Sequence, residues 1–126
     1  GIVGGEPLPA VEIIPHSGTY DFQAKYERSD TRYVIAPDLP DGVDATLEEV
    51  ALTLFRAIDA RHLARVDFLI DETGPWLLEI NTMPGFTAQS LLPKAAMARG
   101  WPLAEVCGRL IHMALDRPGE AAAALC

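Results

Sequence analysis

The stretch between Arg65 and Leu91 constrains the fold of this chain more than any other. It contains two short segments rich in apolar residues, 67–70 and 76–80, joined by a turn with a Gly-Pro pair. This pattern predicts two β-strands, and the short connection predicts that they pair as an antiparallel hairpin. Acidic and amide side chains occur in this stretch at positions where a purely structural hairpin would not need them.

The register of this hairpin decides which of its side chains lie together. If residues 71–75 form the loop, Asp67 lies opposite Glu79, and Arg65 lies opposite Asn81. Directly opposed side chains are about 5 Å apart at Cβ, so two carboxylates and an amide oxygen converge on one face. Like charges this close repel, and hard oxygen ligands suit Mg²⁺, so the sequence predicts a magnesium site. A loop one residue longer or shorter would break this match of faces.

Asp67 also has a purely structural interpretation. It interrupts an apolar strand, where desolvating a carboxylate is costly unless the group is paired or coordinated. A salt bridge to Arg65 or Arg61 would satisfy it without a metal ion. The presence of Glu79 and Asn81 on the same expected face favours the metal site.

Composition excludes several classes of protein. The chain has 126 residues, 49% of them hydrophobic, which suffices for one domain with its own core. The net charge of −8 argues against nucleic acid or an anionic membrane as the main partner. We find neither a signal peptide nor a spanning apolar run in this sequence, and we expect a cytoplasmic protein. Cys107 and Cys126 lack metal-binding spacing and are expected to be free thiols.

Periodicity along the chain predicts an α+β fold. The expected elements are strands at 2–3 and 11–14, a helix over 47–58, the hairpin, and helices over 93–99 and 103–114. This order is typical of helices that cover one side of a mainly antiparallel sheet. The segment over about residues 15–40 shows no sustained helical or strand periodicity. It contains aromatic residues, which favours a lid that packs against the rest of the protein. Residues 117–126 are expected to form a frayed tail.

Three motifs resemble one enzyme family. Residues 65–67 read Arg-Val-Asp, residues 78–87 read Leu-Glu-Ile-Asn-Thr-Met-Pro-Gly-Phe-Thr, and residues 90–96 read Ser-Leu-Leu-Pro-Lys-Ala-Ala. Together they closely resemble the C-terminal half of D-alanine–D-alanine ligases, members of the ATP-grasp superfamily. Residues 20–26 are similar to the ω-loop of that family, and residues 2–9 are similar to the strand pair before it.

The resemblance implies a reaction and a set of metal ligands. The family joins two D-alanines with ATP hydrolysis, through an acyl phosphate, to make the dipeptide of bacterial peptidoglycan precursors. Two Mg²⁺ ions, or Mn²⁺, would bind Asp67, Glu79 and Asn81 and neutralise the phosphate oxygens of ATP. Arg65 and the backbone N–H of Gly85 would stabilise the oxyanion formed when the second D-alanine attacks.

The resemblance also implies roles in substrate binding and in the lid. Ser90 and the N–H of Leu91, near a helix start, would hold the carboxylate of the second D-alanine. Lys25 would reach the γ-phosphate, and the catalytic residue Tyr26 would latch the closed lid against an N-terminal domain.

The implied domain organisation makes this chain one part of a larger enzyme. Residues 1–116 would form the C-terminal ATP-grasp subdomain, and the first five residues read as the middle of a strand. The N-terminal and central domains would lie outside this chain, which would be inactive alone, and the whole enzyme would be a homodimer. Two alternatives stay open: a non-catalytic module that binds a nucleotide or a partner, and an ATP-grasp ligase for another carboxylate.

Overall fold

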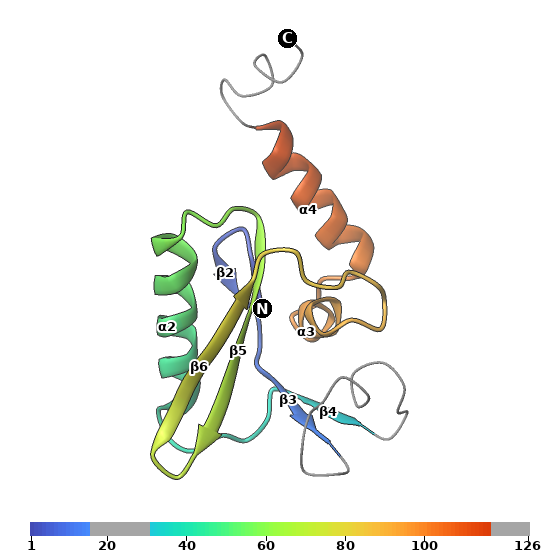
Figure 1. Cartoon of the computed structure of the whole chain (residues 1–126). Helices are drawn as coiled ribbons and strands as arrows, with labels where there is room; N and C mark the ends of the chain where they lie inside the picture. The colour runs from blue at the N-terminus through green and yellow to red at the C-terminus, as the bar shows by residue number, and fades with distance from the viewer. Residues whose placement is uncertain (16–30, 117–126) are drawn as a thin grey trace.

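A four-stranded antiparallel sheet forms the centre of the computed structural model, which describes residues 1–15 and 31–116 (Figure 1). Its strand order is β2-β1-β5-β6, with β1 at Ile2–Val3, β2 at Glu6–Pro7, β5 at Leu63–Asp71 and β6 at Gly74–Asn81. A second, two-stranded sheet pairs β3 (Val11–Ile14) with β4 (Arg32–Ile35). Helices α2 (Val43–Ala57), α3 (Leu91–Ala98) and α4 (Leu103–Leu115) accompany the sheets. The predicted α+β class is confirmed.

Two neighbouring residues of β1 connect the sheet to separate parts of the core. Ile2 packs with Phe55 of α2 and with Ala64, whereas Val3 belongs to a cluster with Leu92 of α3 and Val106 of α4. Successive strand residues point to opposite faces, so α2 covers one face while α3 and α4 pack at the other. We expected helices on one side of the sheet. This arrangement holds for the β5–β6 hairpin, which packs against α2, but the sheet as a whole has helices at both faces.

The segment expected to be a lid contains a strand. Residues 32–35 form β4, in which Tyr33 pairs with Ile13 and Ile35 pairs with Val11. Residues 16–30, which include most of the expected lid, lie outside the residues that the structure describes, as does the expected tail at 117–126.

The hairpin has the predicted pairing at the acidic end and a different one at the turn. Asp67 pairs with Glu79, and Arg65 pairs with Asn81. Beyond a bulge after Asp67 the register shifts by one, and the strands continue until Asp71 pairs with Gly74. The predicted loop over 71–75 is therefore wrong, because only Glu72 and Thr73 remain unpaired. One extra residue in β6, Leu78, compensates for the shorter loop, so both acids stay on one face.

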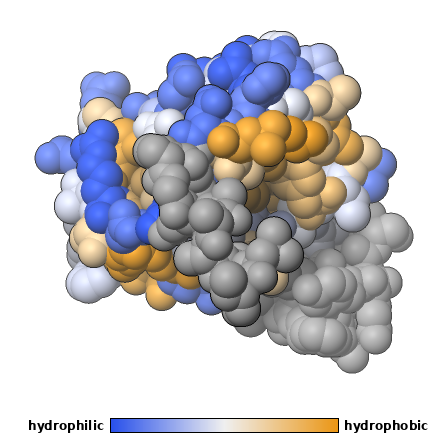
Figure 2. Space-filling model, turned by 90° about the horizontal axis from the view of Figure 1, so that it is seen from above, coloured by the Kyte–Doolittle hydropathy of each residue, from blue (hydrophilic) through white to orange (hydrophobic). Residues whose placement is uncertain are grey.

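Much apolar surface remains exposed in the part of the chain that the structure describes. The exposed large side chains of the hairpin are Leu69, Ile70, Trp76, Leu77 and Leu78. On the face seen from above, apolar side chains also reach the surface beside a hydrophilic band (Figure 2). The hairpin side chains alternate along the two strands and so lie on both faces of the hairpin. Among the described helices, none is both long and apolar enough to cross a membrane.

Candidate functional site

Arg65 joins the two acids of the hairpin on the face turned away from α2. Its Nε donates to Asp67 Oδ1 at 2.8 Å, and its Nη2 donates to Asp67 Oδ2 at 2.9 Å. The same Nη2 lies 3.5 Å from Glu79 Oε1. The Arg65 side chain is 15% exposed, against 32% for Asp67 and 59% for Glu79. The structure thus contains the Arg65–Asp67 salt bridge, which was the alternative to a metal site. It also contains the predicted pairing of Asp67 with Glu79.

Asn81 lies on the same face but is engaged with the following loop. Its Oδ1 accepts a hydrogen bond from the backbone N–H of Met83 at 2.9 Å. This bond turns the chain as it leaves β6 and fixes the amide group. A carbonyl oxygen has two lone pairs, so this atom retains one acceptor site for a further ligand.

The donor set fits a divalent cation that shares its coordination with a substrate. Mg²⁺ is usually held by one or two carboxylates together with phosphate oxygens and water, rather than by a cage of protein ligands. Asp67 and Glu79 supply two facing carboxylates, and Asn81 adds a neutral oxygen. The described residues hold no group of three or more His, Cys, Asp or Glu side chains suited to a metal, so the magnesium site stays a prediction.

The loop between β6 and α3 brings Gly85 and Ser90 together. A Cβ atom at Gly85 would lie only 3.2 Å from Ser90 Oγ, so glycine allows this close approach. Ser90 Oγ accepts a hydrogen bond from the Thr87 backbone N–H at 3.0 Å and lies 3.0 Å from the Thr87 hydroxyl. Phe86 packs against the core cluster that contains Leu92, which anchors this loop.

The start of α3 presents backbone donors beside this loop. Ser90 is the N-cap residue, but its side chain makes no capping hydrogen bond to the helix. The first N–H groups of a helix have no partner within it, and a helix start therefore favours a nearby anion. The third helical residue, Pro93, has no N–H group. The use of Ser90 and Leu91 in substrate binding stays a prediction.

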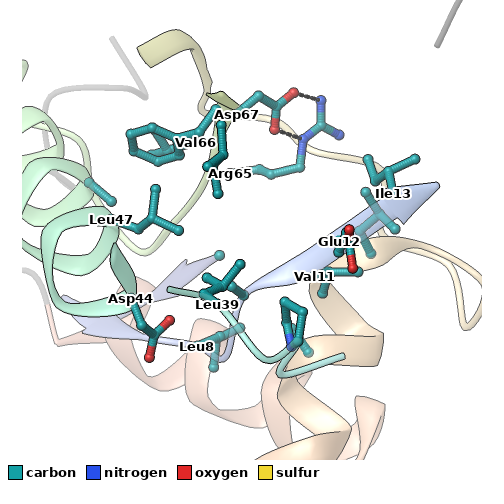
Figure 3. A pocket seen from close by; sticks show the side chains of 18 of the residues that line it. Leu8, Val11, Glu12, Ile13, Leu39, Asp44, Leu47, Arg65, Val66 and Asp67 are labelled. Atoms are coloured by element: carbon teal, nitrogen blue, oxygen red, sulfur yellow. Dashed lines mark hydrogen bonds and ion pairs between the residues drawn. The ribbon is translucent and has the colours of Figure 1, made fainter. Parts of the chain in front are cut away.

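A cleft of about 700 Å³ connects the acidic hairpin with the start of α3. Its lining includes Arg65 and Asp67 from β5 and Leu91 from α3. Figure 3 shows the Arg65–Asp67 pair beside this cleft, with apolar side chains of β3, α2 and the preceding loop around it. Lys25 and Tyr26, predicted to act from the lid, lie outside the described residues.

One contact near the site was not anticipated from the sequence. Lys94 Nζ lies 4.7 Å from the centre of the Tyr33 ring, a cation–π contact between α3 and β4. The Lys94 backbone N–H also bonds the Ser90 carbonyl at 3.2 Å. The sequence places Lys94 four residues after Ser90, one helical turn away on the same side, but it carries no signal for Tyr33 as the partner.

Comparison with solved structures identifies the class of fold. A D-alanine–D-alanine ligase from Bacillus anthracis, solved in complex with ATP, matches with a TM-score of 0.75 and 31% sequence identity. The match covers 90% of this chain and 37% of that one. The fold is therefore that of the C-terminal ATP-grasp region of these ligases.

Sequence comparison gives the family. A family model described as "D-ala D-ala ligase C-terminus" matches residues 1–112, and the chain belongs to this family. The D-alanine–D-alanine ligase of Syntrophotalea carbinolica is 41% identical over 111 residues, covering 88% of this chain and 36% of that protein. The ligase of Bordetella avium is 45% identical over 101 residues, covering 79% and 32%. The chain thus spans about a third of the length of these curated relatives.

Proposed function

We propose that this chain is the C-terminal part of an ATP-dependent D-alanine–D-alanine ligase that makes the dipeptide for peptidoglycan precursors in the cytoplasm. The observation that carries the proposal is the pairing of Asp67 with Glu79 across the hairpin, with Arg65 bonded to both. The names of the curated relatives support the choice of substrate.

The proposed reaction has two steps. The carboxylate of the first D-alanine attacks the γ-phosphorus of ATP, which gives an acyl phosphate and releases ADP. The amine of the second D-alanine then attacks the acyl carbon, loses a proton and expels phosphate. When bound by Asp67, Glu79 and Asn81, two Mg²⁺ or Mn²⁺ ions would supply charge neutralisation at the phosphate oxygens.

The residues of this chain would orient the groups that react in the second step. The Arg65 guanidinium, fixed by Asp67, lies on the acidic face and would stabilise the oxyanion together with the Gly85 N–H. Ser90 Oγ and the Leu91 N–H would bind the carboxylate of the second D-alanine, aided by the positive end of the α3 dipole. Gly85 and Ser90 lie close together in space, which supports the proposal that both contact the second D-alanine.

The remaining roles follow from the family resemblance. Lys25 would contact the γ-phosphate of ATP, and Tyr26 would help to close the lid over the site. The N-terminal and central domains would provide the other half of the active site, and the whole enzyme would be a homodimer. The isolated chain would therefore be inactive.

Substitution of the facing acids in the full-length protein tests this function. Asp67→Asn and Glu79→Gln preserve side-chain size and remove the charge, and each should lower phosphate release from ATP and D-alanine by about a hundredfold or more. Glu72→Gln is a matched control in the exposed turn of the same hairpin and should stay within about twofold of the unsubstituted enzyme. Near-normal turnover by either acid variant would overturn the assignment.

A substrate screen separates the two alternatives. A ligase of the proposed type should give its highest kcat/KM with D-alanine in both positions. A preference for another amino acid or hydroxy acid would identify a different ATP-grasp ligase. Binding of ATP without phosphate release for any acceptor would indicate a non-catalytic module.

A further inference from the structure

Thr87 and Ser90 are joined by three contacts in the loop that leads into α3. The Thr87 N–H donates to Ser90 Oγ at 3.0 Å, and the two hydroxyl oxygens also lie 3.0 Å apart. The Ser90 N–H donates to the Thr87 carbonyl oxygen at 2.9 Å and closes the turn. The Ser90 side chain is therefore held by Thr87, three positions before it, whereas it makes no capping bond to the helix that follows.

The sequence of α3 explains why the Ser90 side chain turns toward the loop. An N-cap serine usually accepts a hydrogen bond from the N–H of the second or third helical residue. The third residue of α3 is Pro93, which has no N–H group. On the loop side, Gly85 leaves room for the hydroxyl, since a Cβ atom there would lie 3.2 Å from Ser90 Oγ. The Ser90 hydroxyl is thus placed among residues of the loop, where we propose that the second D-alanine binds.

The contact between the two hydroxyls allows either of them to donate, and the direction decides what Ser90 can bind. A serine hydroxyl has one hydrogen to donate and two lone pairs that accept. The Thr87 N–H occupies one of these lone pairs. If the Thr87 hydroxyl donates, it occupies the other, and the Ser90 hydrogen is left for a ligand that accepts. If Ser90 donates to Thr87 instead, one lone pair is left for a ligand that donates.

We propose that Thr87 is a positioning residue for the second substrate and acts through Ser90. An ionised carboxylate only accepts hydrogen bonds, so Ser90 can bind it only when the Thr87 hydroxyl donates. The N–H and the hydroxyl of Thr87 then fill both lone pairs of Ser90 Oγ and direct its hydrogen to the carboxylate. The inference rests on the proposed function of Ser90, and it adds Thr87 as the residue that selects an acceptor substrate with a carboxylate.

The exposure of Thr87 allows this role to be separated from packing. Substitution of an exposed side chain usually changes the free energy of unfolding little. Thr87→Val keeps the branched shape and removes the hydroxyl, whereas Thr87→Ser keeps the hydroxyl. Thr53→Val is the matched control, because Thr53 is also exposed and lies in α2, which covers the other face of the sheet. Thermal unfolding of each variant verifies that the fold is kept.

Competition between two acceptors in the full-length protein tests the inference. D-alanine is the first substrate, and D-alanine competes as acceptor with D-alaninamide, whose neutral amide can donate; mass spectrometry measures both products. The ratio of kcat/KM for D-alanine to that for D-alaninamide should fall about tenfold in Thr87→Val, because Ser90 can then accept from the amide. It should stay within about twofold of the unsubstituted value in Thr87→Ser and Thr53→Val. An unchanged ratio in Thr87→Val, as a general disturbance of the loop would give, overturns the inference.

A second substitution tests whether Thr87 acts through Ser90. Ser90→Ala should raise the KM for the acceptor D-alanine, and adding Thr87→Val to it should change that KM by less than about twofold. Independent losses that multiply in the double variant would overturn the inference. The unsubstituted enzyme is the reference for the proposed function: if it forms no dipeptide from D-alanine, that function and the role of Thr87 both fail. Dipeptide formation with an unchanged ratio in Thr87→Val overturns the role of Thr87 alone.

Discussion

Arg65 donates two hydrogen bonds to Asp67, two residues further along the same strand, at 2.8 and 2.9 Å. Residues two apart in a strand share a face, so this pair forms within β5 itself. Directly opposed like charges destabilise a sheet, and Asp67 lies opposite Glu79. The guanidinium, which reaches both acids, offsets their repulsion. Arg65 therefore has a structural role that does not depend on a bound substrate.

Replacing Arg65 by methionine should affect both stability and activity. The variant leaves two facing carboxylates without their cation, and we expect a loss of about 2 kcal/mol in the free energy of unfolding. Dipeptide formation should fall by about a hundredfold or more if Arg65 stabilises the oxyanion. Urea denaturation and steady-state kinetics on the full-length protein measure the two effects. Arg61→Met, at an exposed arginine, is the control and should change neither by much.

Replacing Gly85 by alanine should affect binding of the second substrate. The new Cβ would lie 3.2 Å from Ser90 Oγ, so the serine must move. We expect the KM for the second D-alanine to rise by about tenfold while ATP binding is unchanged. Gly108→Ala is a matched control in α4, where nothing lies within 4 Å of the added atom. It should stabilise the protein by up to about 1 kcal/mol and leave KM unaltered.

The contact between Lys94 and Tyr33 should contribute to the docking of α3 on β4. We expect Lys94→Met to lower the free energy of unfolding by about 0.5 to 1 kcal/mol. Tyr33→Phe keeps the ring and should have little effect, whereas Tyr33→Leu should match Lys94→Met. A double-mutant cycle with Lys94→Met and Tyr33→Leu measures the coupling directly. A coupling near zero would show that the two side chains are neighbours without a stabilising interaction.

The turn of the hairpin should give a pH-dependent contribution to stability. Hydrogen bonds from the Thr73 hydroxyl, and then from the Thr73 backbone N–H, hold the pKa of Asp71 below its usual value. Because the folded-state pKa is lowered, this stabilisation is present above the unfolded-state pKa and is lost as the pH falls through the folded-state pKa. Asp71→Asn should therefore be less stable than the unsubstituted protein at neutral pH, and the difference should shrink in acid. Denaturant midpoints measured across this range check the trend, and a difference independent of pH would contradict it.

The sequence predicted the acidic pairing but not the way in which the hairpin achieves it. A loop over 71–75 was expected, and the turn is closed by Asp71, whose carboxylate accepts bonds from Thr73 at 2.8 and 2.6 Å and from Trp76 Nε1 at 3.0 Å. The bulge at Leu78 compensates for the shorter turn. Neither feature follows from hydrophobic periodicity, because a bulge depends on the geometry of both strands.

Other parts of the fold were harder to predict because they depend on distant contacts. Strand β4 has only four residues, and its partner β3 ends at Ile14, far away in the sequence. Helices α3 and α4 were predictable, since proline and glycine mark their ends and apolar residues recur at helical spacing. Two contacts could not be predicted because they depend on the folded loop and on the packing of α3. They are the close approach of Gly85 to Ser90 and the contact of Lys94 with Tyr33.

The bulge at Leu78 keeps the two acids opposite each other although the turn is shorter than the loop expected from the sequence. With a two-residue turn, the extra residue sits in β6; with a five-residue turn, it would be absorbed in the loop and the strands could pair without a bulge. Both arrangements place Asp67 opposite Glu79. The same residues between the two acids can therefore be divided differently between turn and strand without rotating the carboxylates to the wrong side of the sheet.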